Sequence, residues 1–334
     1  KAILSVTLNQ KFLTFNIPTF VDMSDWWQTT FPNGRQTLTI KDAAGCPVRI
    51  AYGEKGKGQP LVLVHGVGVW SYCWRYNIDV LAAHHRVICF DSKGSGYSDK
   101  PNRPESVGHQ VVELARILET VCDESAVLVS ESLGALTSLG LAVEYPDLLD
   151  RLVVMNVPIF PKKLPNWGMQ ILADLPLELI QCVDWLRLPY FFAPLVRQIA
   201  AIARRDVVVD PNRITEEEVY WATHPYIEFP GTLTKFAEDL KVGLQDIQNN
   251  LANQPSYLKT IQDGLSTLHH PTLILWSDQD RWFPPDDGRK LHSHLPNSIF
   301  KIISDCGHQA SSGNPTAVNR EILEFLLSRN AVGA

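Results

Sequence analysis

One serine, one histidine and two aspartates stand where together they could activate a nucleophile. Ser132 lies in the segment Ser-Glu-Ser-Leu-Gly, between an apolar run and a helix-like stretch. A serine hydroxyl is a poor nucleophile at neutral pH, and it needs a base within hydrogen-bond reach that a third group orients. Asp278 and Asp280 follow a second apolar run, and His308 follows a third. The pattern therefore predicts a Ser-His-Asp triad.

The base is selected from ten histidines. Only His308 follows an apolar run and a glycine at the right point in the chain. The pairs at 84–85 and 269–270 precede strand-like runs in polar connections, and we expect them to be solvated. His292 and His294 lie in a helix-like stretch at a spacing of two residues, which places them on different faces. A metal site at that pair is therefore not expected.

Small residues around the serine and in an earlier loop indicate an oxyanion hole. A serine in a tight strand-to-helix turn needs small neighbours, and Ser130 meets that need. One donor would be the backbone N–H of Leu133, and the second would be that of Val67 in the loop after the run at 61–64. Gly66 lets this backbone approach a substrate oxygen closely. We interpret the neighbouring His65 as a structural histidine that holds the loop.

Strands and helices must alternate to position these residues. Continuous apolar runs predict strands that are buried on both faces of a parallel sheet, at 61–64, 87–90, 126–129, 152–155 and 272–275. A strand is also expected at 299–303. Two further strands are expected at 37–40 and 48–52, and helices at about 106–122, from 133, near 286–294 and after Asn314, which can cap the last one. The alternation implies crossover connections and a mostly parallel sheet.

Changes in the pattern of strand-like and helix-like segments divide the chain into four parts. Residues 1–33 are expected to form an N-terminal extension whose aromatics pack on the main domain. Residues 34–157 and 269–334 are the two parts of the core, and 158–268 is an inserted helical cap, rich in proline and aromatic residues. The apolar residues of the cap predict an apolar pocket. The segment 188–205 also fits an amphipathic helix that touches a lipid surface.

Residues 90–101, Phe-Asp-Ser-Lys-Gly-Ser-Gly-Tyr-Ser-Asp-Lys-Pro, resemble a loop of known α/β-hydrolases. These are the epoxide hydrolase, dehalogenase and carbon–carbon hydrolase group, and the resemblance extends over about 36–328 outside the cap. It implies the α/β-hydrolase fold and a triad in the order nucleophile, acid, base, which is the order in this chain. The family pattern places the acid shortly before a proline. This favours Asp280 over Asp278, which would then be a loop carboxylate.

The type of nucleophile decides between activities within that group. Haloalkane dehalogenases and epoxide hydrolases use an aspartate that forms an alkyl ester, and Ser132 cannot form this intermediate. Val67 also lacks the side-chain donor that dehalogenases place there for halide. Both activities are therefore excluded, which leaves acyl chemistry at the serine with His308 as base and Asp280 as the group that orients it.

We expect a carboxylic-ester hydrolase that acts on a small hydrophobic ester. One alternative is a carbon–carbon bond hydrolase of a diketone-type substrate, which uses the same triad and a similar cap. A second alternative is a receptor-like member of the superfamily that binds a ligand with little turnover.

Composition restricts the partners of the chain. The 334 residues carry a net charge of −6, which argues against nucleic acid as a partner and makes contact with an anionic membrane surface less favourable. The six cysteines are scattered without metal-ligand spacing, and together with the absence of a signal-peptide pattern they indicate a cytoplasmic protein. The Gly-x-Gly segments lack the full nucleotide-binding fingerprints, so neither a cofactor nor a metal ion is expected.

Overall fold

Eight strands form one sheet in the order β1-β2-β4-β3-β5-β6-β7-β8. The computed structural model describes residues 24–328 of the chain. The strands are β1 Gln36–Lys41, β2 Pro47–Lys55, β3 Pro60–Val64, β4 Arg86–Phe90, β5 Ala126–Glu131, β6 Leu149–Met155, β7 Thr272–Ser277 and β8 Ser298–Ile303. β2 pairs antiparallel with β1 and β4, and the remaining neighbours are parallel. All eight strands predicted from the sequence are present, and the mostly parallel sheet is confirmed.

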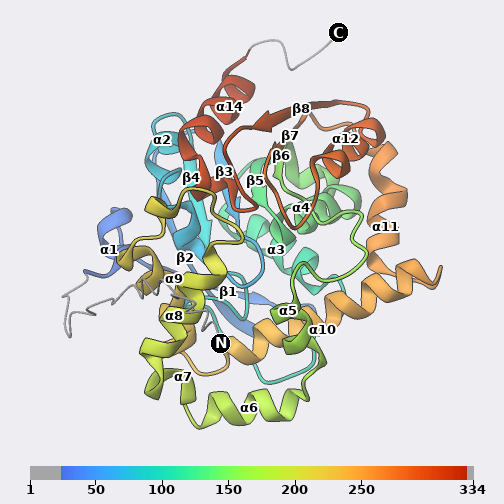
Figure 1. Cartoon of the computed structure of the whole chain (residues 1–334). Helices are drawn as coiled ribbons and strands as arrows, with labels where there is room; N and C mark the ends of the chain where they lie inside the picture. The colour runs from blue at the N-terminus through green and yellow to red at the C-terminus, as the bar shows by residue number, and fades with distance from the viewer. Residues whose placement is uncertain (1–23, 329–334) are drawn as a thin grey trace, which may run out of the picture.

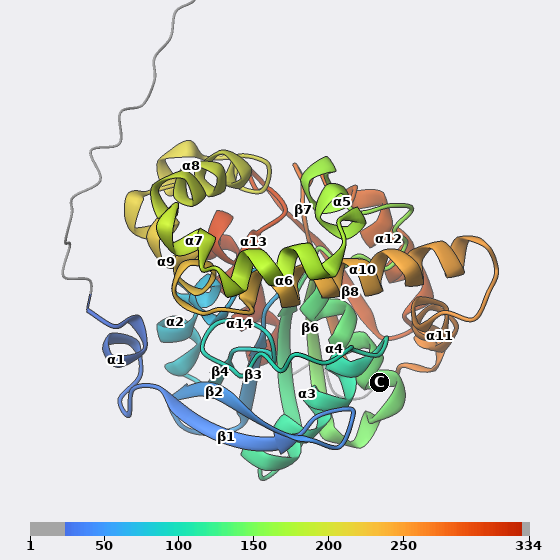
Figure 2. The same cartoon turned by 90° about the horizontal axis from the view of Figure 1, so that it is seen from below.

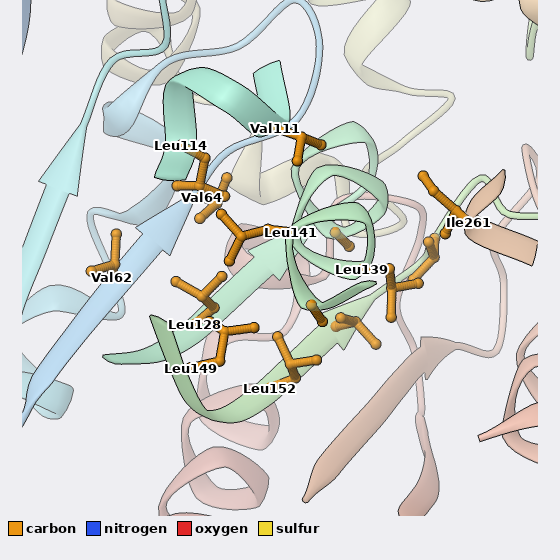
Figure 3. Packing of buried hydrophobic residues seen from close by; sticks show 14 of the residues in the cluster. Val62, Val64, Val111, Leu114, Leu128, Leu139, Leu141, Leu149, Leu152 and Ile261 are labelled. Atoms are coloured by element: carbon orange, nitrogen blue, oxygen red, sulfur yellow. The ribbon is translucent and has the colours of Figure 1, made fainter. Parts of the chain in front are cut away.

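Helices cover both faces of this sheet. Residues of β3, β5, β6 and β7 are therefore buried on both sides. One face packs against α3 (His109–Val121), α4 (Leu133–Glu144) and α12 (Pro285–His294). Figure 3 shows part of this core, with Val64 of β3, Leu114 of α3 and Leu141 of α4 directed toward one another. The other face packs against α2 (Ile78–Ala82) and α14 (Pro315–Leu327). The predicted cap of α14 is also present, since Asn314 Oδ1 accepts the N–H of Ala317 at 3.3 Å.

A run of helices separates β6 from β7, and it occupies the segment that we predicted as a cap. Its members are α5 Trp167–Asp174, α6 Leu177–Trp185, α7 Leu188–Phe191, α8 Ala193–Arg204, α9 Glu216–Glu228, α10 Thr232–Leu251 and α11 Tyr257–Gly264. In both views, α5 to α10 lie together on one side of the strands (Figures 1 and 2). Within residues 24–328, no helix combines the length and the apolar character that crossing a membrane requires.

The predicted N-terminal extension falls partly outside the described residues, because the description begins at residue 24. The described part contains α1 (Trp26–Thr30), whose two tryptophans are buried. Trp26 packs edge-on against Trp70 and Tyr72 at ring-centre distances of 5.4 and 5.6 Å. These aromatics therefore pack on the main domain, as we expected from the sequence.

Candidate active site

Ser132 lies on a sharp turn between the end of β5 and the start of α4. Its backbone φ of 55° falls in a region that residues other than glycine rarely adopt. This strained turn places the hydroxyl above the end of the sheet. The turn also brings α4 very close to the end of β3. A Cβ on Gly134 would lie 2.5 Å from the carbonyl oxygens of Val64 and His65, so only glycine fits there.

The structure brings Ser132, His308 and Asp280 together in one chain of hydrogen bonds. His308 Nε2 lies 2.9 Å from the serine Oγ, and Nδ1 lies 2.8 Å from Asp280 Oδ2. A carboxylate only accepts, so Nδ1–H donates to Asp280 and Nε2 is left to accept from the serine hydroxyl. The second oxygen of Asp280 accepts the backbone N–H groups of Trp282 and Phe283 at 2.8 and 3.1 Å. These bonds fix the carboxylate against the imidazole.

Asp278 has a different set of contacts. Its two oxygens accept the backbone N–H groups of Asp305 and Cys306, each at 3.1 Å. The carboxylate therefore holds the loop that leads to His308, while Asp280 contacts the imidazole itself. This geometry agrees with the choice of Asp280 as the acid and with the interpretation of Asp278 as a loop carboxylate.

The loop after β3 lies directly against the serine. A Cβ on Gly66 would stand 3.0 Å from Ser132 Cβ, and Val67 and Leu133 line the same cavity as the serine. Leu133 is the first residue of α4, so its N–H has no acceptor within the helix. His65 holds this loop: its Nε2 accepts the N–H of Ser92 at 3.0 Å, and its Nδ1 lies 2.8 Å from the Gly66 oxygen. Burial lowers the pKa of His65, which keeps the ring neutral in this role.

Two buried polar residues connect the loops of the site, and sequence reasoning missed both. Asn156, just after β6, donates from Nδ2 to the carbonyl oxygen of His308 at 2.5 Å and to Ser277 Oγ at 3.0 Å. Glu131, just before the serine, accepts from the N–H and hydroxyl of Ser311 at 3.0 and 2.7 Å. Burial raises the pKa of the Glu131 carboxyl. The sequence did offer a signal for both, because each is a polar residue at the carboxyl end of a buried strand.

A cavity of about 120 Å³ lies in front of the serine. Its apolar lining includes Leu136, Leu164, Met169, Leu240, Ile247, Leu258, Trp282 and Phe283. The ring of Trp282 packs over His308 with centres 4.5 Å apart. The pocket is thus apolar, as we expected. The cap contributes aliphatic side chains to this lining, and two of its aromatic residues, Trp167 and Trp185, are instead 78% and 79% exposed.

The remaining histidines lie outside this site. His292 is exposed, as we expected, but our expectation for His85 is wrong because its ring is buried. In the described part of the chain, one group has the spacing to hold a metal ion, namely Glu105, His109 and Glu113. The ammonium of Lys93 lies 2.7 and 2.5 Å from those two carboxylates. A lysine therefore already supplies the positive charge that a metal ion would bring.

The comparison with known proteins identifies the family. A family described as alpha/beta hydrolase fold matches residues 59–197 and 201–315. The chain belongs to the alpha/beta hydrolase fold family. Members of this family place the nucleophile on a strained turn at the top of the sheet, in the order serine, acid, histidine. The positions of Ser132, Asp280 and His308 follow that arrangement.

Three similar proteins show how far the likeness extends. A 2-hydroxy-6-oxononadienedioate/2-hydroxy-6-oxononatrienedioate hydrolase of Burkholderia vietnamiensis is 27% identical over 84% of this chain and 92% of its own length. A 2-hydroxy-6-oxo-6-phenylhexa-2,4-dienoate hydrolase of Comamonas testosteroni is 28% identical with the same coverage. A thermophilic esterase from Thermogutta terrifontis, of known structure, has a TM-score of 0.65 at 21% identity over 87% of this chain and 98% of its own. The similarity to the esterase concerns the fold alone.

Proposed function

We propose that this hydrolase attacks a carbonyl carbon with Ser132 and passes through an acyl-enzyme. The hydrogen-bonded chain from Ser132 through His308 to Asp280, beside an apolar cavity, carries the proposal. His308 takes the hydroxyl proton as the serine attacks, and Asp280 stabilises the imidazolium that forms. The N–H groups of Val67 and Leu133 would receive the negative oxygen of the tetrahedral intermediate. Water, deprotonated by the same imidazole, then releases the acid.

We propose further that the bond broken is a carbon–carbon bond beside a ketone. The support comes from the two relatives, whose names describe hydrolases of 2-hydroxy-6-oxo dienoates and which match most of this chain. They favour the carbon–carbon alternative over the ester hydrolase that we preferred from the sequence. In this reaction the departing carbon must leave as an enolate. A 2-hydroxy-6-oxo dienoate therefore first isomerises to its keto tautomer, in which the 2-hydroxy proton has moved to the carbon beside the ketone. The His308 imidazolium holds the proton taken from the serine and can return it to the departing enolate.

Ester hydrolysis remains the second candidate, because one observation favours it. The cavity beside the serine is lined mainly by aliphatic and aromatic side chains. Lys163 is the one basic residue among the cavity's lining residues, which also include Asp239 and Asp246. Such a lining suits an uncharged hydrophobic ester better than a substrate with a free carboxylate.

Parallel assays on two substrate classes separate these candidates. The purified full chain would be given 2-hydroxy-6-oxo-6-phenylhexa-2,4-dienoate, whose conjugated absorbance disappears on cleavage, and a series of 4-nitrophenyl esters from acetyl to medium acyl chains. Carbon–carbon hydrolysis predicts that kcat/KM for the dienoate exceeds that for every ester. An ester hydrolase would instead show turnover that rises with acyl length and leaves the dienoate intact.

The control variants assign the activity to the serine. Ser132→Ala is expected to abolish turnover of both substrate classes. Ser138→Ala removes another buried serine hydroxyl, one that donates to the Gly134 oxygen at 2.9 Å inside α4, and it should retain activity. Folded wild-type protein that binds the dienoate and cleaves neither class would contradict the proposal and favour a receptor-like role.

A further inference from the structure

The loop that follows β3 contains Val67, one of the two proposed oxyanion donors, and we name residues 65–70 the oxyanion loop. His65 Nε2 accepts the N–H of Ser92 at 3.0 Å, so Nδ1 carries the ring proton and donates it to the Gly66 oxygen at 2.8 Å. The Gly66 carbonyl and the Val67 N–H belong to one peptide unit. In a trans peptide these two groups point in opposite directions. The core, through His65, therefore fixes the side on which the Val67 N–H emerges.

The next part of the oxyanion loop is held by the cap. The hydroxyl of Tyr226, on α9, donates to the carbonyl oxygen of Gly68 at 2.9 Å. Gly68 has a φ of 72°, and a Cβ on it would stand 2.9 Å from the ring of Phe236 on α10. The rings of Tyr226 and Phe236 pack edge-on with centres 6.0 Å apart. Two cap helices thus meet the loop at a single residue, and only glycine allows so close an approach.

The end of the oxyanion loop is held by a contact that depends on a proline inside α9. Pro225 has no N–H, so the carbonyl of Trp221, one turn earlier, lacks its usual helical donor. The indole N–H of Trp70 donates to that oxygen at 2.8 Å. Trp70 is buried, and a buried N–H that loses its partner is costly. This hydrogen bond therefore fixes the end of the loop against α9.

The Val67 peptide thus lies between anchors from two parts of the molecule, with the core on the Gly66 side and the cap on the Gly68 side. An oxyanion donor is effective because it is already in place when the negative charge develops. A misplacement of about 1 Å can cost on the order of a hundredfold in rate. The cap can therefore affect the chemical step without contacting the substrate.

We propose that Tyr226 is a positioning residue, through which the cap holds the Val67 N–H in the direction that the oxyanion requires. This role rests on the proposed function, in which that N–H stabilises the tetrahedral intermediate formed at Ser132. It gives the cap a part in the chemical step besides the lining of the cavity. The described residues that line the cavity do not include Tyr226, so its hydroxyl acts through the loop.

Steady-state kinetics of Tyr226→Phe tests the proposal on whichever substrate class the wild type turns over. The variant keeps the ring and loses only the hydroxyl that donates to Gly68. We expect kcat to fall by about tenfold, because the donor itself remains, and KM to stay within about twofold. The matched control is Tyr257→Phe, which removes a hydroxyl that donates to Glu144 at 2.6 Å between α11 and α4. The control should keep the kcat of the wild type.

An inhibitor that imitates the intermediate separates positioning from a general loss of structure. A trifluoromethyl ketone adds to an activated serine and places a negative oxygen in the oxyanion hole. Its Ki should rise in Tyr226→Phe by about the factor by which kcat/KM falls, because both depend on the same donor. Thermal unfolding establishes that both variants are folded.

The proposal is overturned if folded Tyr226→Phe turns over substrate and binds the ketone like the wild type. It is also overturned if Tyr257→Phe loses as much kcat as Tyr226→Phe. A rise in KM at unchanged kcat would equally overturn it, because the hydroxyl would then contribute to substrate binding alone. Folded wild-type protein that cleaves neither substrate class would instead overturn the proposed function, and the positioning role with it.

Discussion

His109 belongs to a buried cluster of charges that joins α3 of the core to α10 of the cap. Its Nδ1 lies 3.4 Å from Glu113 Oε2, and its Nε2 lies 3.5 Å from Asp239 Oδ1 on α10. Burial by itself lowers the pKa of His109, but the carboxylates of Asp239 and Glu113 outweigh it and raise the pKa from 6.5 to about 9. The other charged groups of the cluster are Asp42, Lys93, Arg103, Glu105, Lys235 and Glu238.

The raised pKa makes the stability of the fold depend on pH. Between pH 6.5 and about 9, the folded chain holds a proton on His109 that the unfolded chain has lost. The contribution of this residue to the free energy of unfolding is therefore complete below about pH 6.5 and disappears as the pH rises through about 9. The rise of the His109 pKa from 6.5 to about 9 corresponds to about 3 kcal/mol of stability.

Urea unfolding of the wild type and of His109→Gln at about pH 6 and about pH 9.5 measures this contribution. We expect the wild type to lose about 3 kcal/mol more between the two pH values than the variant loses. Burial lowers the pKa of Lys100 to about 8, so above that pH this residue makes the free energy of unfolding rise with pH. This contribution is the same in the wild type and the variant, and it cancels when the two are compared. His292→Gln, a change at an exposed histidine, should behave like the wild type. Equal pH dependence in the wild type and His109→Gln would show that His109 does not contribute this stability.

Three further predictions concern the acid, the turn around the serine and helix α10. Asp280→Asn should lower kcat by about the 10⁴-fold that the same change costs in Ser-His-Asp proteases, whereas Asp278→Asn, which contacts loop N–H groups, should cost far less. Steady-state kinetics on whichever substrate class is turned over checks this difference. Gly134→Ala should destabilise the fold by about 1–3 kcal/mol, because its Cβ would press on two carbonyl oxygens. Gly243→Ala in α10 has nothing within 4 Å of its Cβ and should stabilise the helix by about 0.5–1 kcal/mol, as read from thermal unfolding.

The sheet and the triad positions were accessible from the sequence because their signals are local. A strand that is buried on both faces must be continuously apolar, and the run before Ser132 is of this kind. The small residues around the serine follow from the strained turn, in which Gly134 has no room for a side chain. A glycine and a strand with apolar residues likewise mark the position of His308. Each of these constraints acts within a few residues of the chain.

The charged cluster and the orientation of α8 depend on contacts between distant segments. Lys93 and Lys235 are 142 positions apart in the printed sequence, and both contact Glu105. No local pattern pairs them. The exposure of Trp167 and Trp185 was not accessible for a similar reason, because composition shows that a helix is apolar and does not show which way it faces. Arg204 of α8 contributes to that orientation through its ion pair with Glu218 of α9, which also lies 3.5 Å from the guanidinium of Arg75.

Labelling with a fluorophosphonate probe, followed by peptide mass spectrometry, tests the central claim most directly. An activated serine hydroxyl reacts with this probe, whereas an ordinary one does not. We predict a single modification on Ser132 in the wild type, and none in Ser132→Ala or His308→Gln. A folded wild-type protein that stays unlabelled, or a label that persists in Ser132→Ala, would contradict the assignment of Ser132 as the nucleophile.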